Sequence, residues 1–136
     1  MITFRDTAAG IAPQQLAGFF VGWQRPPTPE THLRLLDASD RVVVAFDDES
    51  SRVVGFATAL TDGILAAYIS FIEVLPSYQR QGIGRELVRQ LLQTLDGLYM
   101  VDTITDSELT PFYREHGLLP GTGMMLRRYQ SQSGLS

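Results

Sequence analysis

The sequence predicts an α+β domain in which helices flank a mixed sheet. Apolar patterns follow the order strand, two helices, three strands, helix, strand, helix and strand, without the regular alternation of a doubly wound fold. At 136 residues the chain has enough length for one domain with a real core. We assign residues 1–129 to this domain and expect the polar residues 130–136 to form a disordered tail.

The first half of the chain alternates between short strand patterns and helices that begin at a proline. Leu16, Phe19, Phe20 and Trp23 recur at helical spacing after Pro13, which suits a first helical turn. A polar hairpin turn at residues 47–52 separates two apolar runs. The expected elements are a strand at Ile2 to Arg5, helices at 13–23 and 29–36, and strands at 42–46 and 53–60.

The second half contains the longest apolar run and the clearest amphipathic helix. Leu87, Val88, Leu91, Leu92 and Leu95 form one stripe, which is typical of a helix packed on a sheet. The expected elements are a strand at 65–75, helices at 85–95 and 107–116, a strand at 98–104, and one or two short strands within 118–129.

Composition and charge exclude several classes of function. The net charge of −4 argues against sequence-independent nucleic-acid binding, which needs a basic surface. There are no cysteines, and His32 and His116 lie far apart in sequence, so we expect no metal site. No signal-peptide pattern is visible and no apolar run reaches the roughly 18 residues that span a bilayer, so we expect a cytoplasmic protein without membrane contact.

The most informative motif is Gln79-Arg80-Gln81-Gly82-Ile83-Gly84, which joins the 65–75 strand to the 85–95 helix. Two glycines allow a tight turn and close approach of the backbone to a ligand. The N-terminus of the following helix carries unpaired N–H groups and a partial positive charge, which suit a phosphate. Arg80 and Arg85 would be mildly unfavourable at this positive helix end unless an anion lay between them.

Residues 72–84 resemble the acetyl-CoA signature of the Gcn5-related N-acetyltransferase (GNAT) superfamily, a strand followed by Q/R-x-x-G-x-G/A opening a helix. Residues 111–118, PFYREHGL, resemble a second element of the same family, F-Y-x-x-x-G-F. A lone G-x-G is weak, but two ordered motifs in the expected strand and helix contexts form a specific signal. The two matches cover about a third of the chain, and the expected element order agrees with the GNAT order.

The resemblance implies a single-domain, GNAT-like acetyltransferase that uses acetyl-CoA as co-substrate, without a metal, and has a possible homodimeric state. Its sheet would be mixed and mostly antiparallel, with two splayed parallel central strands ending at Leu75 and spanning 98–104. Main-chain groups at Ile72 and Val74 would pair with the pantetheine arm, and Tyr113 would stand near the thioester sulfur. The implied cofactor-binding residues are Ile72, Val74, Gln79, Arg80, Gln81, Gly82, Ile83, Gly84 and Arg85.

The chain departs from the family pattern at two positions. Asp106 stands where the family often has asparagine, which puts a negative charge near coenzyme A, although an aspartate can still cap the helix. Tyr68 aligns with the glutamate that serves as base in the histone-modifying members. That base therefore does not carry over to this chain.

Acetyl transfer to an amine requires a neutral amine, a stabilised oxyanion and a protonated leaving thiolate. Tyr113 is the expected acid, because a phenol is neutral at pH 7. Glu73 is a candidate base, since burial within an apolar strand would raise a carboxyl pKa. A structural pair with an arginine, or a side chain turned to solvent at a strand bulge, would explain Glu73 equally well. Asp102, Asp106 or a water chain compete for the base.

The acceptor is expected to be a primary amine of a small molecule or peptide. Trp23 could line the acceptor site, whereas Phe19 and Phe20 are expected in the core. An alternative function is a catalytically silent acyl-CoA-binding sensor or regulatory module. A dinucleotide-binding module is disfavoured, because Leu87 occupies the place of the third glycine in G-x-G-x-x-G.

Overall fold

The computed structural model, which describes residues 1–135, has a single five-stranded sheet with helices on both faces. The strands are β1 (Ile2–Arg5), β2 (Arg41–Asp47), β3 (Arg52–Thr61), β4 (Ala66–Val74) and β5 (Met100–Asp102), in the spatial order β1-β2-β3-β4-β5. Neighbouring strands are antiparallel except β4 and β5, which are parallel. The predicted α+β class with a mixed, mostly antiparallel sheet is confirmed.

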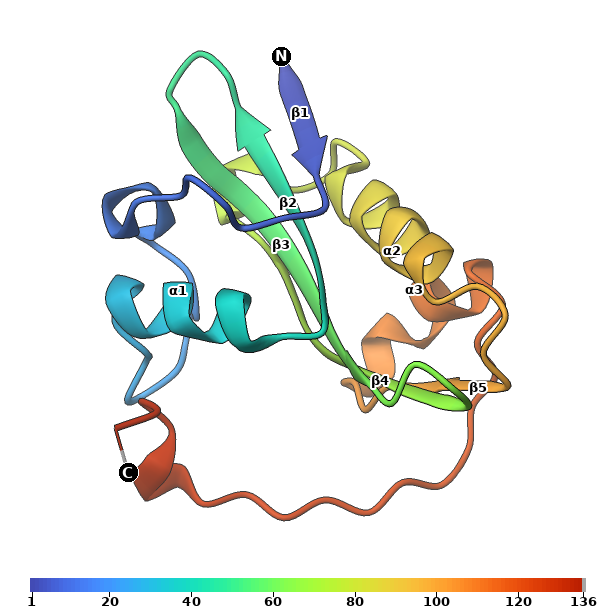
Figure 1. Cartoon of the computed structure of the whole chain (residues 1–136). Coiled ribbons are helices and arrows are strands. Elements are labelled where there is room, and N and C mark those ends of the chain that lie inside the picture. The colour runs from blue at the N-terminus through green and yellow to red at the C-terminus, as the bar shows by residue number, and fades with distance from the viewer. Residues whose placement is uncertain (136) are drawn as a thin grey trace.

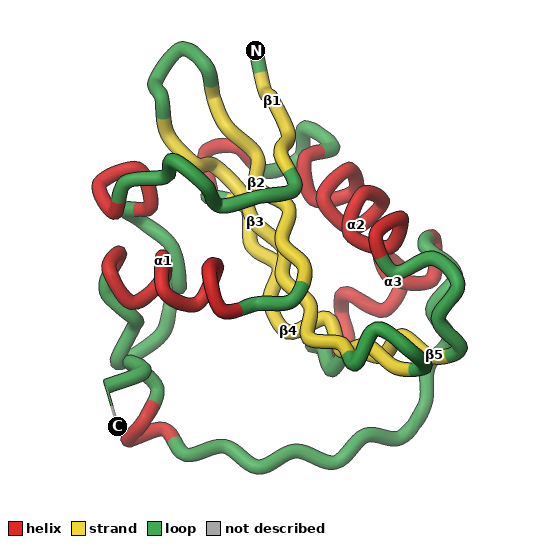
Figure 2. The backbone as a smooth tube through the Cα atoms, in the orientation of Figure 1, coloured by secondary structure: helices red, strands yellow, loops and turns green. Residues whose placement is uncertain are grey.

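Within residues 1–135, three α-helices flank this sheet (Figures 1 and 2). Helix α1 (Pro29–Ala38) lies on one face, and α2 (Ile83–Thr94) and α3 (Thr110–Glu115) lie on the other. Thr28 caps the N-terminus of α1, because its hydroxyl accepts a hydrogen bond from the Thr31 N–H, and Pro29 takes the first helical position. The core consists of the sheet interior with the inward faces of α1 and α2, represented by Leu36, Phe56 and Leu87.

Close packing of α2 on the sheet depends on Gly55 in β3. A Cβ atom at this position would lie 3.0 Å from Leu87 Cδ1 and 3.3 Å from both the Glu73 carbonyl oxygen and Ile83 Cγ2. Any larger residue would therefore separate the helix from β3. Helix α2 begins two residues earlier than the expected 85–95 helix, because Ile83 is buried in the core.

The expected helix at 13–23 is wrong. Only Pro13–Leu16 forms a single 3₁₀ turn, and the chain then reverses direction repeatedly. Gly18, Phe20 and Gly22 all adopt positive φ angles of 96°, 63° and 84°. Left-handed residues at alternate positions cannot continue a right-handed helix, so the apolar spacing here reflects a buried loop.

The strands expected within 118–129 are also absent from the part of the chain that the structure describes. Residues 118–128 instead run as an extended segment away from α3 toward the N-terminal side of α1 (Figure 1). The chain then makes a single turn at Tyr129–Ser131. The disorder expected for residues 130–136 stays a prediction, and Ser136 lies outside the described residues.

Candidate active site

The candidate site lies where β4 and β5 separate. Their parallel pairing runs from Ala66 opposite Met100 to Tyr68 opposite Asp102, and β4 then continues to Val74 without β5 beside it. Just past the last pair, the Thr103 hydroxyl donates a 2.9 Å hydrogen bond to the Ile69 carbonyl oxygen. This fork matches the splayed parallel strands that the resemblance implied, although β5 is shorter than the expected strand at 98–104.

A turn with two left-handed residues leads from β4 into α2. Arg80 has a φ angle of 63° and Gly82 one of 82°, and Gly82 is the N-cap of α2. Among residues 1–135, the first amide of this helix with a hydrogen-bond partner is that of Glu86, which donates to the Gly82 carbonyl oxygen at 3.1 Å. The N–H groups of residues 83–85 therefore point outward without protein partners.

The turn faces open space at Gly82. A Cβ atom at Gly82 would meet nothing within 4 Å, so the backbone faces open space. The outward N–H groups and the positive end of the α2 dipole together favour an anion at that place. The backbone amides of Ile83, Gly84 and Arg85 are therefore candidate donors to an anion.

The predicted cofactor residues on β4 and at its end lie along one side of the fork. Ile72 and Val74 are partly buried on β4, and a Cβ atom at Gly84 would lie 3.7 Å from Val74 Cγ2. The Gln79 side-chain amide donates a 3.0 Å hydrogen bond to the Val74 carbonyl oxygen. Gln79 therefore fixes the end of β4 against the turn.

The remaining predicted cofactor residues differ in what their side chains do. Arg80 and Gln81 are exposed, whereas the Ile83 side chain is buried in the core. Arg85 forms a 3.3 Å ion pair with Glu115 of α3, in which both side chains are largely exposed. The backbone amides of the turn thus support phosphate binding better than the Arg85 guanidinium does.

Tyr113 of α3 is buried at the fork, with only 5% of its surface exposed. Burial raises the pKa of its phenol above the ordinary value, the neighbouring Thr103 hydroxyl acts in the opposite direction, and a smaller electrostatic effect of Tyr68 adds to the rise. Tyr113 therefore stays protonated at neutral pH, as an acid must. The sequence analysis predicted Tyr113 as a site residue but did not predict Thr103 beside it, because a single threonine after a strand belongs to no recognisable motif.

Glu73 binds backbone amides of the loop that crosses above β4. Its carboxylate accepts hydrogen bonds from the Phe20 N–H at 2.8 Å and the Val21 N–H at 3.2 Å. Neither of the structural explanations considered from the sequence, an arginine pair or a bulge, includes these bonds. The β4 bulge falls at Ser70, opposite the step from Thr58 to Ala59, three residues before Glu73.

An aromatic wall lies beside Glu73. Phe20 packs against Trp23 and His32, with ring centroids 4.9 Å apart in both pairs, and Trp23 lies 6.2 Å from Phe71 of β4. Phe19 and Phe20 are buried, which confirms their expected place in the core. Trp23 is only partly buried, so one side of its ring borders solvent.

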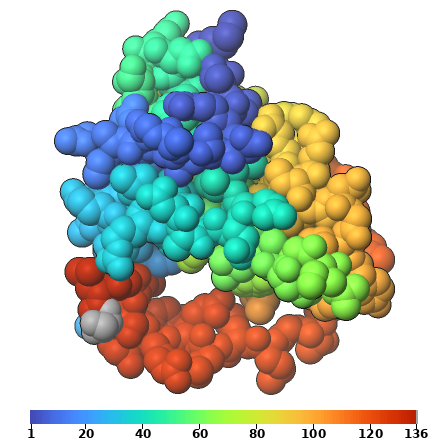
Figure 3. All heavy atoms as spheres, viewed as in Figure 1, coloured from blue at the N-terminus to red at the C-terminus, as the bar shows by residue number. Residues whose placement is uncertain are grey.

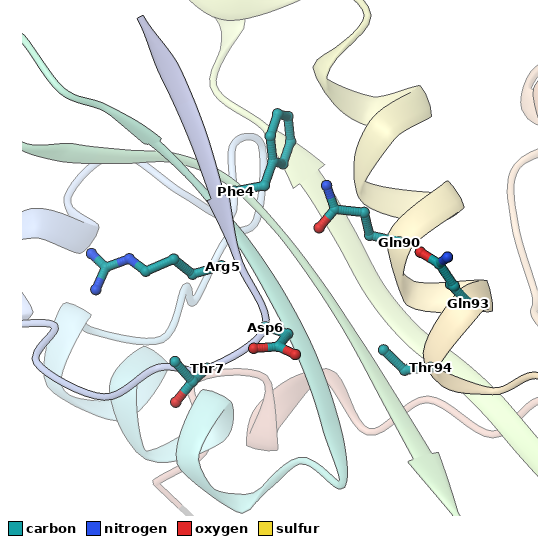
Figure 4. A pocket seen from close by; sticks show the side chains of 7 residues that line it. All are labelled: Phe4, Arg5, Asp6, Thr7, Gln90, Gln93 and Thr94. Atoms are coloured by element: carbon teal, nitrogen blue, oxygen red, sulfur yellow. The ribbon is translucent and has the colours of Figure 1, made fainter.

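Other polar residues that the sequence singled out lie outside this arrangement. His116 ends α3, and burial is the main cause that lowers its pKa. Asp106 occupies the N-cap position of the Ser107–Leu109 turn, but its side chain makes no capping hydrogen bond there. A separate hollow of about 570 Å³ between β1 and α2, lined by Phe4, Arg5, Asp6, Thr7, Gln90, Gln93 and Thr94, contains none of the predicted site residues (Figure 4).

Within residues 1–135, no three His, Cys, Asp or Glu side chains gather closely enough to hold a metal ion. None of the helices in that range is both long and apolar enough to cross a bilayer.

The site thus combines an α+β sheet forked between β4 and β5, a turn with outward-facing amides and a buried tyrosine. The acetyltransferase (GNAT) family profile matches residues 10–118, which is most of the chain. The chain therefore belongs to the GNAT acetyltransferase family, and the resemblance inferred from its motifs is confirmed.

Individual relatives agree with this assignment. An uncharacterised N-acetyltransferase, ycf52, of Porphyra purpurea is 30% identical over 103 residues, covering 73% of this chain and 59% of that protein. The chain thus spans about three-fifths of the length of the curated relatives that it first matches. A presumed acetyltransferase from Deinococcus radiodurans R1 has 46% identity and a TM-score of 0.95, covering 99% of this chain and 94% of that one. An aminoglycoside N-acetyltransferase solved with CoA shares the fold alone, at 18% identity and a TM-score of 0.64 over 94% of each chain.

Proposed function

We propose that this chain transfers an acetyl group from acetyl-CoA directly to a primary amine of a small molecule or peptide. The observation that carries the proposal is the turn at the end of the forked strand β4, where the amides of residues 83–85 have no partner among the described residues and Gly82 faces open space. The solved neighbour that contains CoA supports coenzyme A as the ligand of this fold. A cytoplasmic location stays a prediction.

The proposed chemistry uses residues at the fork. Bound acetyl-CoA supplies the acetyl group as a thioester. The amine lone pair forms the new C–N bond at the thioester carbon, and the C–S bond then breaks with its electron pair going to sulfur. Tyr113 donates its phenolic proton to that sulfur, and the proton lost by the amine later restores the phenol through water. The absence of cysteine favours this direct route over an acetylated enzyme intermediate.

Three carboxylates near the fork are candidates for the base. Glu73 already accepts hydrogen bonds from two backbone amides, so its carboxylate has a positioning role whether or not it also takes a proton. Asp102 and Asp106 are both exposed and close to the fork in sequence, and water can reach either.

The partly exposed Trp23 and its neighbours form the proposed wall for the acceptor amine.

A thiol-release assay with acetyl-CoA across classes of amine tests the proposal. We expect coenzyme A release above the hydrolysis background with at least one class of primary amine, and mass spectrometry should find the acetylated product. Acetyl-CoA binding by calorimetry without turnover over the whole panel would instead identify a silent acyl-CoA-binding module. Absence of binding would remove both functions.

A further inference from the structure

Thr103 occupies the point at which the two parallel strands separate. Tyr68 and Asp102 form the last pair of the β4–β5 ladder, and Thr103 is the next residue of the chain. Its half-buried hydroxyl donates the 2.9 Å hydrogen bond to the carbonyl oxygen of Ile69, a residue that is only 1% exposed. A side-chain hydrogen bond therefore continues the contact between the strands for one residue after the backbone pairing has ended.

The same hydroxyl lies beside the Tyr113 phenol of α3. Burial is the larger effect on this phenol and raises its pKa, a hydrogen bond from the Thr103 side chain lowers the pKa, and a smaller electrostatic effect of Tyr68 raises it. A threonine hydroxyl has one proton to donate, and the O–H bond rotates to suit its acceptor. The Thr103 hydroxyl thus has two acceptors within reach, the Ile69 carbonyl and the phenol oxygen, and it can donate fully to only one of them at a time.

The proposed reaction changes which acceptor is the stronger. When Tyr113 gives its proton to sulfur, it becomes a phenolate in a site where its side chain is only 5% exposed. A buried anion is costly unless a donor faces it, and hydrogen bonds to an ionised oxygen are stronger than those between neutral groups. The phenolate is therefore a stronger acceptor for the Thr103 proton than the Ile69 carbonyl, which receives that proton in the present structure.

No cation neutralises this phenolate among residues 1–135. Arg85 of α2 is held in its 3.3 Å ion pair with α3, Arg114 is exposed, and the exposed Asp102 of β5 is an anion. Burial lowers the pKa of His116, so its ring is neutral at pH 7. Figure 3 shows a gap between the body and the C-terminal segment, whose two arginines at 127–128 are exposed. A neutral hydroxyl is left as the donor.

We propose that Thr103 is a positioning residue for Tyr113: its hydroxyl bonds the Ile69 carbonyl while the phenol is protonated and turns to the phenol oxygen once the proton has passed to sulfur. The Thr103 proton stays on its own oxygen throughout, and the hydroxyl returns to Ile69 when water restores the phenol. The second of these two states rests on the proposed function. A donor already in place where charge develops needs little reorganisation, so it favours the proton transfer.

A titration without substrates tests the contact. Labelling with 3-fluorotyrosine, whose phenol is more acidic than that of tyrosine, makes the five tyrosines visible by fluorine NMR, and Tyr113→Phe assigns the relevant resonance. Thr103→Val and the smaller Thr103→Ala remove the hydroxyl, so the proton of residue 113 should be held at least about threefold more tightly. Thr103→Ser should keep the wild-type midpoint. The matched control is Thr105→Val, at an exposed threonine, which should leave the midpoint unchanged.

Kinetic measurements test the role in proton transfer, with the amine that the thiol-release assay identifies. Thr103→Val should lower kcat about tenfold and move the alkaline fall of the rate to higher pH, while the acetyl-CoA dissociation constant stays within about twofold. Thr103→Ser should recover most of kcat. In the Tyr113→Phe background the same valine should lower kcat by less than about twofold, because no phenolate forms there. Circular dichroism should show the same secondary structure for every variant.

The two experiments distinguish a failure of this inference from a failure of the proposed function. A fluorine midpoint that stays in place without the hydroxyl would overturn the inference, and so would an equal loss of kcat with and without the Tyr113 phenol. Either result combined with weaker acetyl-CoA binding would mean that Thr103 only ties β4 to β5. A raised midpoint in a protein that acetylates no amine would support the Thr103 contact and reject the proposed function.

Discussion

The carboxylate of Glu73 on β4 lies 2.8 Å from the backbone nitrogen of Phe20, a residue with a left-handed φ of 63°. Positive φ is costly for a bulky side chain and persists only where the surroundings hold it. The Glu73 carboxylate stabilises this conformation of Phe20 and also accepts a hydrogen bond from the Val21 N–H. The strand expected to carry pantetheine is thus tied directly to the loop that carries the aromatic wall.

Replacing Glu73 separates its positioning role from a role as base. Glu73→Gln keeps the size but turns amide hydrogens toward at least one backbone N–H, so we expect a loss of about 1–3 kcal/mol in unfolding free energy and a raised KM for the amine. The acidic limb of the pH–rate profile should not move. A shifted limb with unchanged stability would contradict positioning and make Glu73 the base. Glu49→Gln, at an exposed hairpin turn, is the matched control.

Gly82→Trp should abolish acetyl-CoA binding. The indole ring would occupy the open space beside the α2 N-terminus, so calorimetry should show a dissociation constant raised by about 100-fold or more. Gly10→Trp is a stringent control, because Gly10 has the same φ of 82° and equally open surroundings in a distant loop. Equal affinity of both variants for acetyl-CoA would place the ligand elsewhere.

Tyr113→Phe should lower kcat by about 10²–10⁴-fold while acetyl-CoA affinity changes little, because only the proton donor is removed. The raised pKa of Tyr113 places loss of its proton above the ordinary tyrosine range, so the wild-type rate should not fall from this cause near neutral pH. Steady-state assays from pH 6 to 9, with the exposed Tyr99→Phe as control, measure both effects. An unchanged kcat would remove Tyr113 from the mechanism.

Gly55→Ala should destabilise the protein by about 1–3 kcal/mol, because the new methyl group meets Leu87 and a backbone oxygen of β4 at 3.0–3.3 Å. Denaturant unfolding measures this change in unfolding free energy, and the dependence of that free energy on denaturant concentration, m, should stay the same. Gly121→Ala, which meets nothing within 4 Å, should leave stability within about 0.5 kcal/mol. Similar losses in the two variants would show that crowding is not the cause.

His32 should make the protein less stable in mild acid. Its ring is 1% exposed, neither ring nitrogen has a partner among the described residues, and burial lowers its pKa from 6.5 to about 4. The unfolded chain binds the proton first, so stability is complete above about pH 6.5 and falls as the pH drops toward 4, by up to about 3 kcal/mol. The stability difference between His32→Leu and wild type should grow in favour of the variant over that range. A constant difference would contradict a neutral buried His32.

The sequence predicts the parts of this fold whose causes are local. Sequence analysis finds the apolar stripe of α2, at Leu87, Val88 and Leu91, because helical periodicity acts over a few residues. It finds the turn at residues 79–84 for a similar reason, since the helix dipole and the backbone freedom of glycine are also local effects. The loop after Leu16 is not, since its left-handed Phe20 is held by Glu73, 53 residues away. The strands expected within 118–129 are wrong because this segment does not pair with the open edge of β5, and periodicity cannot say which edge a segment will reach.

The same limit applies to the site. Sequence motifs predict Tyr113 and the glycine turn as site residues. The contact of Thr103 with β4 and the hydrogen bond of Glu73 to the loop depend instead on how segments distant in sequence are placed, so no motif predicts them. Individual roles at the cofactor residues stay predictions until ligand binding is measured.

Under the proposed function, the hydrogen bonds between Glu73 and the loop have a practical consequence for redirecting acetyl transfer to a new amine. Changes at residues 19–21 would disturb the proposed acetyl-CoA side and the proposed acceptor side of the site together, because the Glu73 carboxylate links β4 to this loop. Libraries that leave Phe20 and Glu73 intact and diversify residues 23–27, short of the α1 cap at Thr28, should retain more folded clones, so selectivity is best altered from the proline-rich segment.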